Sequence, residues 1–168
     1  MSRPVVAVLN TSEDAVSLVR LCLERAGFLV VAAFTHLFRD GKLNFHQFIV
    51  EHRPTVIVYD IAVPYEQNWA LFQYFSTRPI CRDIQFVVTT TNAAQVREIA
   101  GADLMLHELV GKPYDLEQIV RAVNEAAHAR PIGKNFGADR RAAERRVQSG
   151  DRRQRGDRRR AERVLRES

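Results

Sequence analysis

The sequence contains no run of about eighteen consecutive apolar residues, and its first ten residues, MSRPVVAVLN, lack the pattern of a signal peptide. We therefore predict a cytoplasmic protein with no membrane partner. Cysteine is scarce, with 2 in 168 residues, and neither lies in a CxxC or Cys/His spacing typical of zinc sites. We expect Cys22 to be a core thiol, because it falls on a helical apolar stripe, and Cys81 to be a surface thiol in a loop.

The motifs of several common enzyme classes are also missing. VGKPYD contains a Gly-Lys pair but lacks the upstream glycine and the following Ser or Thr of a phosphate-binding loop. The sequence has no GxGxxG dinucleotide-binding motif and no GxSxG nucleophile elbow. We therefore do not expect an enzyme with turnover.

Charge is distributed unevenly along the chain. Residues 1–129 contain 11 Lys and Arg against 14 Asp and Glu, whereas residues 130–168 contain 14 against 6. The first part therefore has a net charge of −3 and the second a net charge of +8. This contrast predicts a folded domain over residues 1–129 and a basic, Arg-rich tail over residues 130–168.

Short apolar runs alternate with helical patterns in residues 1–129. The runs predict strands at Val5–Leu9, Phe28–Phe34, Thr55–Tyr59, Ile84–Thr90 and His107–Val110. Helical stripes predict helices at about residues 15–26, 45–52, 68–77, 93–100 and 115–129. Strands that alternate with helices pair in parallel through right-handed crossovers. The predicted fold class is therefore α/β, with a doubly wound, five-stranded parallel sheet.

Polar residues follow these strands at the edge where open α/β sheets bind ligands. They are Asn10, Thr11 and Ser12 after the first strand, Asp60 after the third, Thr90 and Thr91 after the fourth, and Lys112 after the fifth. One carboxylate, one hydroxyl and one lysine are thus expected to converge on the same edge of the sheet.

The stretch VIVYDIAVP, residues 56–64, resembles the third strand of a bacterial response-regulator receiver domain, in which an aspartate followed by a hydrophobic stretch and a proline is the phosphoacceptor. Thr90 at the end of FVVTT and Lys112 before Pro113 occupy two further positions of the pattern, and LERAGF matches the join between the first helix and the second strand. The resemblance covers about residues 4–129 and implies the flavodoxin-like fold of CheY-like receivers, followed here by a low-complexity arm.

The resemblance also implies a role in two-component or phosphorelay signal transduction. Asp60 would accept a phosphoryl group from a histidine kinase, a phosphotransfer protein or a small donor. Lys112 would pair with a phosphoryl oxygen, and the Thr90 hydroxyl would move to hydrogen-bond the phosphoryl group. The signal would then pass to a downstream protein partner.

The first strand departs from the family pattern. Receivers normally end this strand in two adjacent acids that bind Mg²⁺, but Asn10 and Thr11 stand there. Asp60 is then the only anionic ligand, with Asn10 a weak one, so we expect the affinity for Mg²⁺ to drop sharply. Glu13 or Asp14 could reach inward, although Thr11-x-x-Asp14 also has the pattern of a capping box. A phosphorylation-independent pseudo-receiver, with Asp60 and Lys112 as an ion pair, is the alternative.

The tail repeats short Asp-Arg-Arg and Glu-Arg-Arg units and has almost no apolar side chains to bury. It cannot form a packed domain by itself, and we expect a disordered or partly helical arm. Three roles remain open: a solvated linker, an arm that docks on an acidic protein, or a nucleic-acid contact in which arginines meet phosphates.

Overall fold

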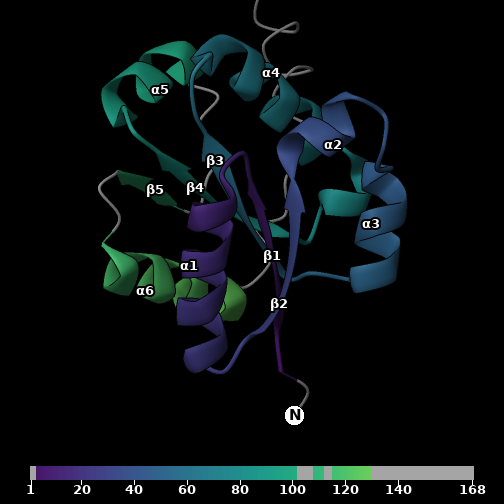
Figure 1. The fold of residues 1–168 in the computed structure, drawn as a ribbon, viewed down its shortest axis with the longest axis vertical. Helices are drawn as coiled ribbons and strands as arrows, with labels where there is room; N and C mark the ends of the chain where they lie inside the picture. The colour runs from purple at the N-terminus through teal and green to yellow at the C-terminus, as the bar shows by residue number, and fades with distance from the viewer. Residues whose placement is uncertain (1–2, 102–107, 112–114, 130–168) are drawn as a thin grey trace, which may run out of the picture. The chain divides into compact units, whose positions relative to one another are not determined.

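The computed structural model describes residues 3–101, 108–111 and 115–129. The strands in this part of the chain are β1 (Val5–Asn10), β2 (Leu29–Phe34), β3 (Val56–Ile61), β4 (Gln85–Thr90) and β5 (Glu108–Gly111) (Figure 1). The helices are α1 (Glu13–Arg25), α2 (Thr35–Arg39), α3 (Phe45–His52), α4 (Tyr65–Ser76), α5 (Ala93–Ala100) and α6 (Leu116–His128), with a 3-10 turn, η1 (Pro79–Cys81), before β4. Among the described helices, none is long and apolar enough to cross a membrane. The tail, residues 130–168, lies outside the described residues, and what the sequence predicts for it stays a prediction.

The strands form one parallel sheet in the order β2-β1-β3-β4-β5. In the central pair, Leu9 of β1 lies opposite Tyr59 of β3, and Asp60 lies opposite Thr89 of β4. Parallel neighbours need crossover connections, which the intervening helices supply. The parallel α/β architecture predicted from the sequence is confirmed.

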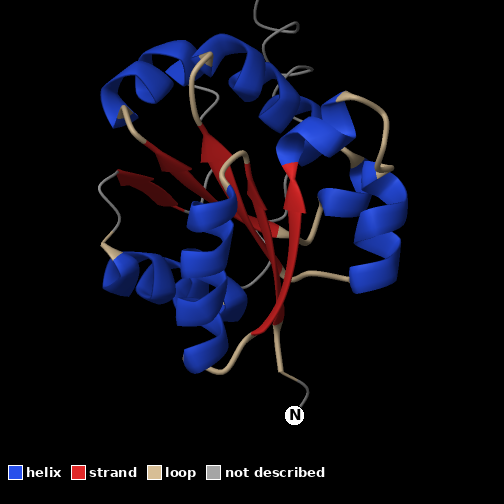
Figure 2. Ribbon diagram, in the orientation of Figure 1, coloured by secondary structure: helices blue, strands red, loops and turns tan. Residues whose placement is uncertain are grey.

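Helices cover both faces of the sheet, as Figure 2 shows. On one face, apolar strand residues pack against α1 and α6; they include Val6, Val8, Val56, Val58 and Val87. Those of the other face pack with α2, α3, α4 and α5 and include Ala7, Leu9, Ile57, Tyr59, Phe86 and Val88. Because successive strand side chains point to opposite faces, strands covered on both sides are apolar throughout, which explains the runs VVAVL and VIVY.

Several element boundaries differ from the prediction, and one helix was not predicted. β3 continues to Ile61, so Asp60 lies inside the strand and not after it, because the ladder with β4 extends to the pair of Ile61 and Thr90. α4 begins at Tyr65, earlier than the predicted start near residue 68. α2 was not predicted, because it has only five residues and no side-chain cap to signal its start.

The two cysteines are placed the opposite way from the prediction. Cys81 is buried in η1 and belongs to the core on the α2–α5 face, whereas Cys22 is partly exposed. The buried side of α1 contains Val16, Val19 and Leu23, and Cys22 is not among these core residues. The prediction was therefore wrong for both thiols.

The start of α1 also differs from the expected capping box. Ser12 is the N-cap residue, and its Oγ accepts a hydrogen bond from the Ala15 backbone N–H at 3.4 Å. Glu13 and Asp14 form the exposed first turn, where acidic side chains complement the positive end of the helix dipole.

Candidate functional site

Three polar side chains lie at the carboxyl ends of neighbouring strands and on the same face of the sheet. Asn10, Asp60 and Thr89 each continue, at a spacing of two residues, the row of valines that faces α1 and α6. All three are buried, with Asp60 and Thr89 each only 1% exposed. This edge of the sheet therefore holds a small, enclosed polar cluster around one carboxylate.

Thr89 is the residue that contacts Asp60. Its Oγ1 donates a hydrogen bond of 2.8 Å to Asp60 Oδ1, and the two residues are register partners on β3 and β4. A hydrogen bond of this length holds the Asp60 carboxylate in a fixed orientation at the edge of the sheet.

Thr90, the hydroxyl predicted from the sequence, lies on the opposite face of β4. It follows Phe86 and Val88 in the row that packs against α2–α5, and its Oγ1 accepts a hydrogen bond from the Asn92 N–H at 3.2 Å. The hydroxyl that contacts Asp60 in the structure is therefore that of Thr89, one residue before the predicted Thr90. In the register between β3 and β4, Val58 lies opposite Val87 and Asp60 opposite Thr89, and this register is not encoded in the local sequence.

Asn10 fixes the turn between β1 and α1. Its Oδ1 accepts hydrogen bonds from the backbone N–H groups of Thr11 at 2.7 Å and Ser12 at 3.0 Å. The side-chain oxygen of Asn10 thus caps the backbone N–H groups of this turn, as Asn side chains commonly do. Thr11, the second position that holds an acid in receivers, is exposed.

These residues do not fit a conventional Mg²⁺ site. Mg²⁺ prefers carboxylate oxygens in near-octahedral geometry, and Asp60 supplies the one carboxylate of the polar cluster. Asn10 Oδ1 already accepts two amide hydrogens. Within the described residues, no group of three or more His, Cys, Asp and Glu side chains could hold a metal ion. Glu13 and Asp14 are exposed in the first turn of α1.

Two hydrogen bonds hold the loops that follow β3 and β4. The Tyr65 hydroxyl, at the start of α4, lies 2.7 Å from Thr91 Oγ1, just after β4. Asn68 Nδ2 donates to the Ala62 carbonyl at 2.8 Å and closes the turn between β3 and α4. The chain segments that leave Asp60 and Thr89 are therefore tied to each other and to α4.

Tyr59, next to Asp60, lies on the other face of β3. Its hydroxyl donates to the Asn68 carbonyl at 3.4 Å. Burial, and then the negative charge of Asp60, raise the pKa of Tyr59 well above its ordinary value, although Arg39 partly offsets this. Tyr59 is thus a neutral hydrogen-bond donor at physiological pH.

The structure does not describe the predicted lysine, Lys112. Lys112 follows β5 in the sequence and, with Pro113, lies outside the described residues. The pairing of Lys112 with a phosphoryl oxygen or with Asp60 therefore stays a prediction.

No protein-family model and no curated protein sequence matches this chain. Solved structures do match. A sensor protein from Polaromonas sp. JS666 superposes with a TM-score of 0.63 at 19% identity, over 75% of this chain and 97% of that one. The chemotaxis protein CheY4 of Vibrio cholerae gives a TM-score of 0.59 at 17% identity, over 74% and 99%.

A response regulator from Thermotoga maritima superposes with a TM-score of 0.57 at 18% identity, over 76% of this chain and all 100% of that one. At such identities the likeness concerns the fold, since one fold supports many functions. The flavodoxin-like fold implied by the resemblance of VIVYDIAVP is thereby confirmed. The part of this chain that the structure describes has the fold of CheY-like response-regulator receiver domains.

Proposed function

We propose that this protein is a receiver-type signalling domain that accepts a phosphoryl group on Asp60. The observation that carries the proposal is the position of Asp60: a buried carboxylate at the carboxyl edge of a parallel sheet, hydrogen-bonded by the Thr89 hydroxyl at 2.8 Å. Open α/β sheets bind their ligands at this edge. The receiver fold supports the same assignment by analogy.

The reaction transfers a phosphoryl group from a donor nitrogen or oxygen atom to a carboxylate oxygen of Asp60. A carboxylate oxygen of Asp60 attacks phosphorus, the bond from phosphorus to the donor atom breaks, and an aspartyl phosphate forms. With a phosphohistidine donor the leaving nitrogen keeps the bonding pair and takes a proton; with acetyl phosphate the leaving group is acetate. The Thr89 hydroxyl would then donate its hydrogen bond to a phosphoryl oxygen.

Charge neutralisation in this site differs from that of receivers with two acids on the first strand. The residues present do not fit Mg²⁺, because Asp60 is the one carboxylate among Asn10, Asp60 and Thr89. Phosphoryl transfer depends largely on positioning and on neutralising the charge of the transferred group. We therefore expect slow phosphorylation with little dependence on Mg²⁺. In this proposal the donor is a histidine kinase or a phosphotransfer protein, and the output is contact with a downstream protein.

A second candidate function is a pseudo-receiver, which keeps the fold as an interaction scaffold without phosphorylation. It is favoured by the engagement of Asn10 Oδ1 with two backbone amides, since a turn built in this way replaces the metal-binding carboxylate of an active receiver. The nucleic-acid role of the Arg-rich tail stays a prediction. Salt-sensitive retention on DNA or RNA that is lost on deletion of residues 131–168 would support it.

Intact mass spectrometry after incubation with acetyl phosphate or phosphoramidate tests the main proposal. We expect an adduct of one phosphoryl group that is lost in Asp60→Asn and released by hydroxylamine, as for an acyl phosphate. Asp83→Asn is the matched control, because Asp83 is an exposed aspartate on the loop before β4. An adduct that persists in Asp60→Asn contradicts the assignment. A chain that stays unmodified with both donors and with phosphorylated kinases favours the pseudo-receiver.

A further inference from the structure

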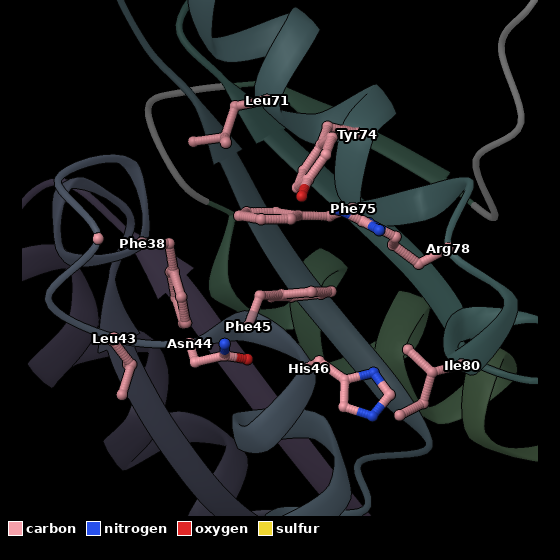
Figure 3. Close-up of a pocket in the computed structure, with 11 residues that line it drawn as sticks. Phe38, Leu43, Asn44, Phe45, His46, Leu71, Tyr74, Phe75, Arg78 and Ile80 are labelled. Atoms are coloured by element: carbon pink, nitrogen blue, oxygen red, sulfur yellow. The ribbon is translucent and has the colours of Figure 1, made fainter.

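A groove of about 490 Å³ lies between the loop that precedes α3 and the end of α4. Figure 3 shows the side chains that line it, which come from residues 38–46 on one side and 71–80 on the other. The groove is on the α2–α5 face of the domain, whereas the side chains of Asp60 and Thr89 point to the opposite face of the sheet. It is therefore separate from the proposed phosphorylation site.

The apolar wall of the groove is built from packed core residues. Phe45 and Phe75 stack with ring centroids 3.9 Å apart, and Phe38 packs edge-on against both rings. All three phenylalanines are buried and belong to the core. Because these rings are packed in the core, an apolar side chain of a ligand would bind to a preformed surface. The phenylalanines of the groove would then lose little conformational entropy on binding.

A cation is fixed beside this wall. The Arg78 guanidinium lies 4.0 Å from the ring centroid of Tyr74, and Tyr74 is 54% exposed. In Figure 3 the two side chains lie side by side near Phe75. Stacking on an aromatic ring orients a guanidinium and leaves its N–H edge able to pair with a carboxylate.

The segments that form the groove are basic, although the domain as a whole is acidic. Residues 38–46 and 71–80 contain Arg39, Lys42 and Arg78 against the single acid Asp40. Asp40 itself lies 3.5 Å from Arg39. Residues 1–129 together have a net charge of −3. The groove is thus a local positive region on an acidic domain, which favours an acidic ligand.

We propose that this groove binds an acidic segment of a partner protein, with an aromatic or aliphatic side chain seated against Phe45 and Phe75 and a carboxylate paired with Arg78. Large aromatic side chains in pockets, flanked by charged pairs, are the usual anchors of such contacts. The Arg-rich tail of this chain does not match the groove in charge, since residues 130–168 contain 14 Lys and Arg against 6 acids and are themselves positive. The proposal concerns the unphosphorylated protein and does not depend on phosphorylation of Asp60.

Selection of short random peptides by phage display against the full chain tests this proposal. We expect enriched peptides that combine acids with one aromatic or aliphatic residue and that bind less tightly as salt is raised. Their affinity, measured by fluorescence anisotropy, should fall about tenfold or more in Arg78→Glu. Leu71→Glu, which places a charge on the apolar lining, should weaken the same peptides.

Arg121→Glu is the matched control, because Arg121 is an exposed arginine of α6 on the other face of the sheet. Equal loss in Arg121→Glu would show a general charge effect and overturn the proposal. Enrichment of basic peptides, or the failure to recover any peptide that depends on Arg78, would do the same. Dimerisation that is abolished by Arg78→Glu, observed by analytical ultracentrifugation, would assign the groove to a second copy instead.

Discussion

The hydroxyl of Thr89 donates a 2.8 Å hydrogen bond to the carboxylate of Asp60, and the two residues face each other across neighbouring parallel strands. Thr90, the next residue, points to the other face and accepts a hydrogen bond from the Asn92 amide. The two threonines are adjacent in sequence and both buried, and the hydrogen bond to Asp60 comes from Thr89. This difference gives a closely matched pair of variants.

Replacement of Thr89 by valine keeps the side-chain shape and removes the hydrogen bond to the carboxylate. We expect Thr89→Val to lower the free energy of unfolding by about 2 kcal/mol, because a hydrogen bond to a charged group is lost. Phosphorylation by acetyl phosphate should also slow, as measured by intact mass against time. Thr90→Val should cost about 1 kcal/mol and leave the rate near that of the wild type. A slower reaction in Thr90→Val than in Thr89→Val would contradict the assignment.

Replacement of Asn10 by aspartate adds a second carboxylate beside Asp60. A carboxylate oxygen of aspartate can accept the same two backbone hydrogen bonds that Asn10 Oδ1 accepts, so the turn should keep its conformation. Without metal, two like charges in a buried cluster should lower the melting temperature. With Mg²⁺ at one hundred times its Kd, stability should recover by about 2.7 kcal/mol.

Thermal unfolding with EDTA or with Mg²⁺ measures this response, and the wild type should show almost none. Asn92→Asp is the control, since it adds the same charge at the exposed N-cap of α5. An equal response to Mg²⁺ in the wild type would mean that the Asn10 site already holds the ion.

Replacement of Tyr65 by phenylalanine removes the 2.7 Å contact with Thr91 that joins the loops after β3 and β4. A net contribution of about 1 kcal/mol predicts about fivefold faster hydrogen exchange at the amides of these two loops. Exchange in the strands of the core should not change. Tyr74→Phe is the control, because Tyr74 lies at the other end of α4 against Arg78. Unchanged loop exchange in Tyr65→Phe would show that the contact does not hold the loops.

The raised pKa of Tyr59 predicts an alkaline loss of stability. Below the ordinary pKa of 10.0, the tyrosine is protonated in both the folded and the unfolded chain, so its ionisation does not lower the free energy of unfolding. Above pH 10.0, the unfolded chain ionises while the buried folded residue stays neutral, and the free energy of unfolding falls. One such group accounts for at most about 1.4 kcal/mol per pH unit.

Tyr59→Phe should therefore show a shallower loss of stability above pH 10.0 than Tyr74→Phe, with urea midpoints as the measurement. The loss of the Tyr59 hydrogen bond should cost about 1 kcal/mol at neutral pH, in a pH-independent manner. Identical alkaline slopes in the two variants would show that Tyr59 does not control this transition.

Local patterns were sufficient to predict most of the architecture. The runs VVAVL and FVV lie within parallel strands because residues covered on both faces must be apolar. Asp115 caps α6, as its place before the stripe of Leu116, Ile119 and Val123 predicts. Errors arose where local signals were weak or missing: α2 has no side-chain cap, and the stripe assigned to α1 included Cys22, which is partly exposed.

The sequence by itself determined the alternation of strands and helices and the candidate carboxylate, because apolar periodicity and strand order are local properties of the chain. Only the tertiary structure decided which threonine meets Asp60, since this depends on the register between β3 and β4, which are linked through α4. It also decided that Asn10 Oδ1 is used by the Thr11 and Ser12 amides. The groove at Phe45 and Phe75 exists only because α3 and α4 pack together, and no local pattern encodes that contact.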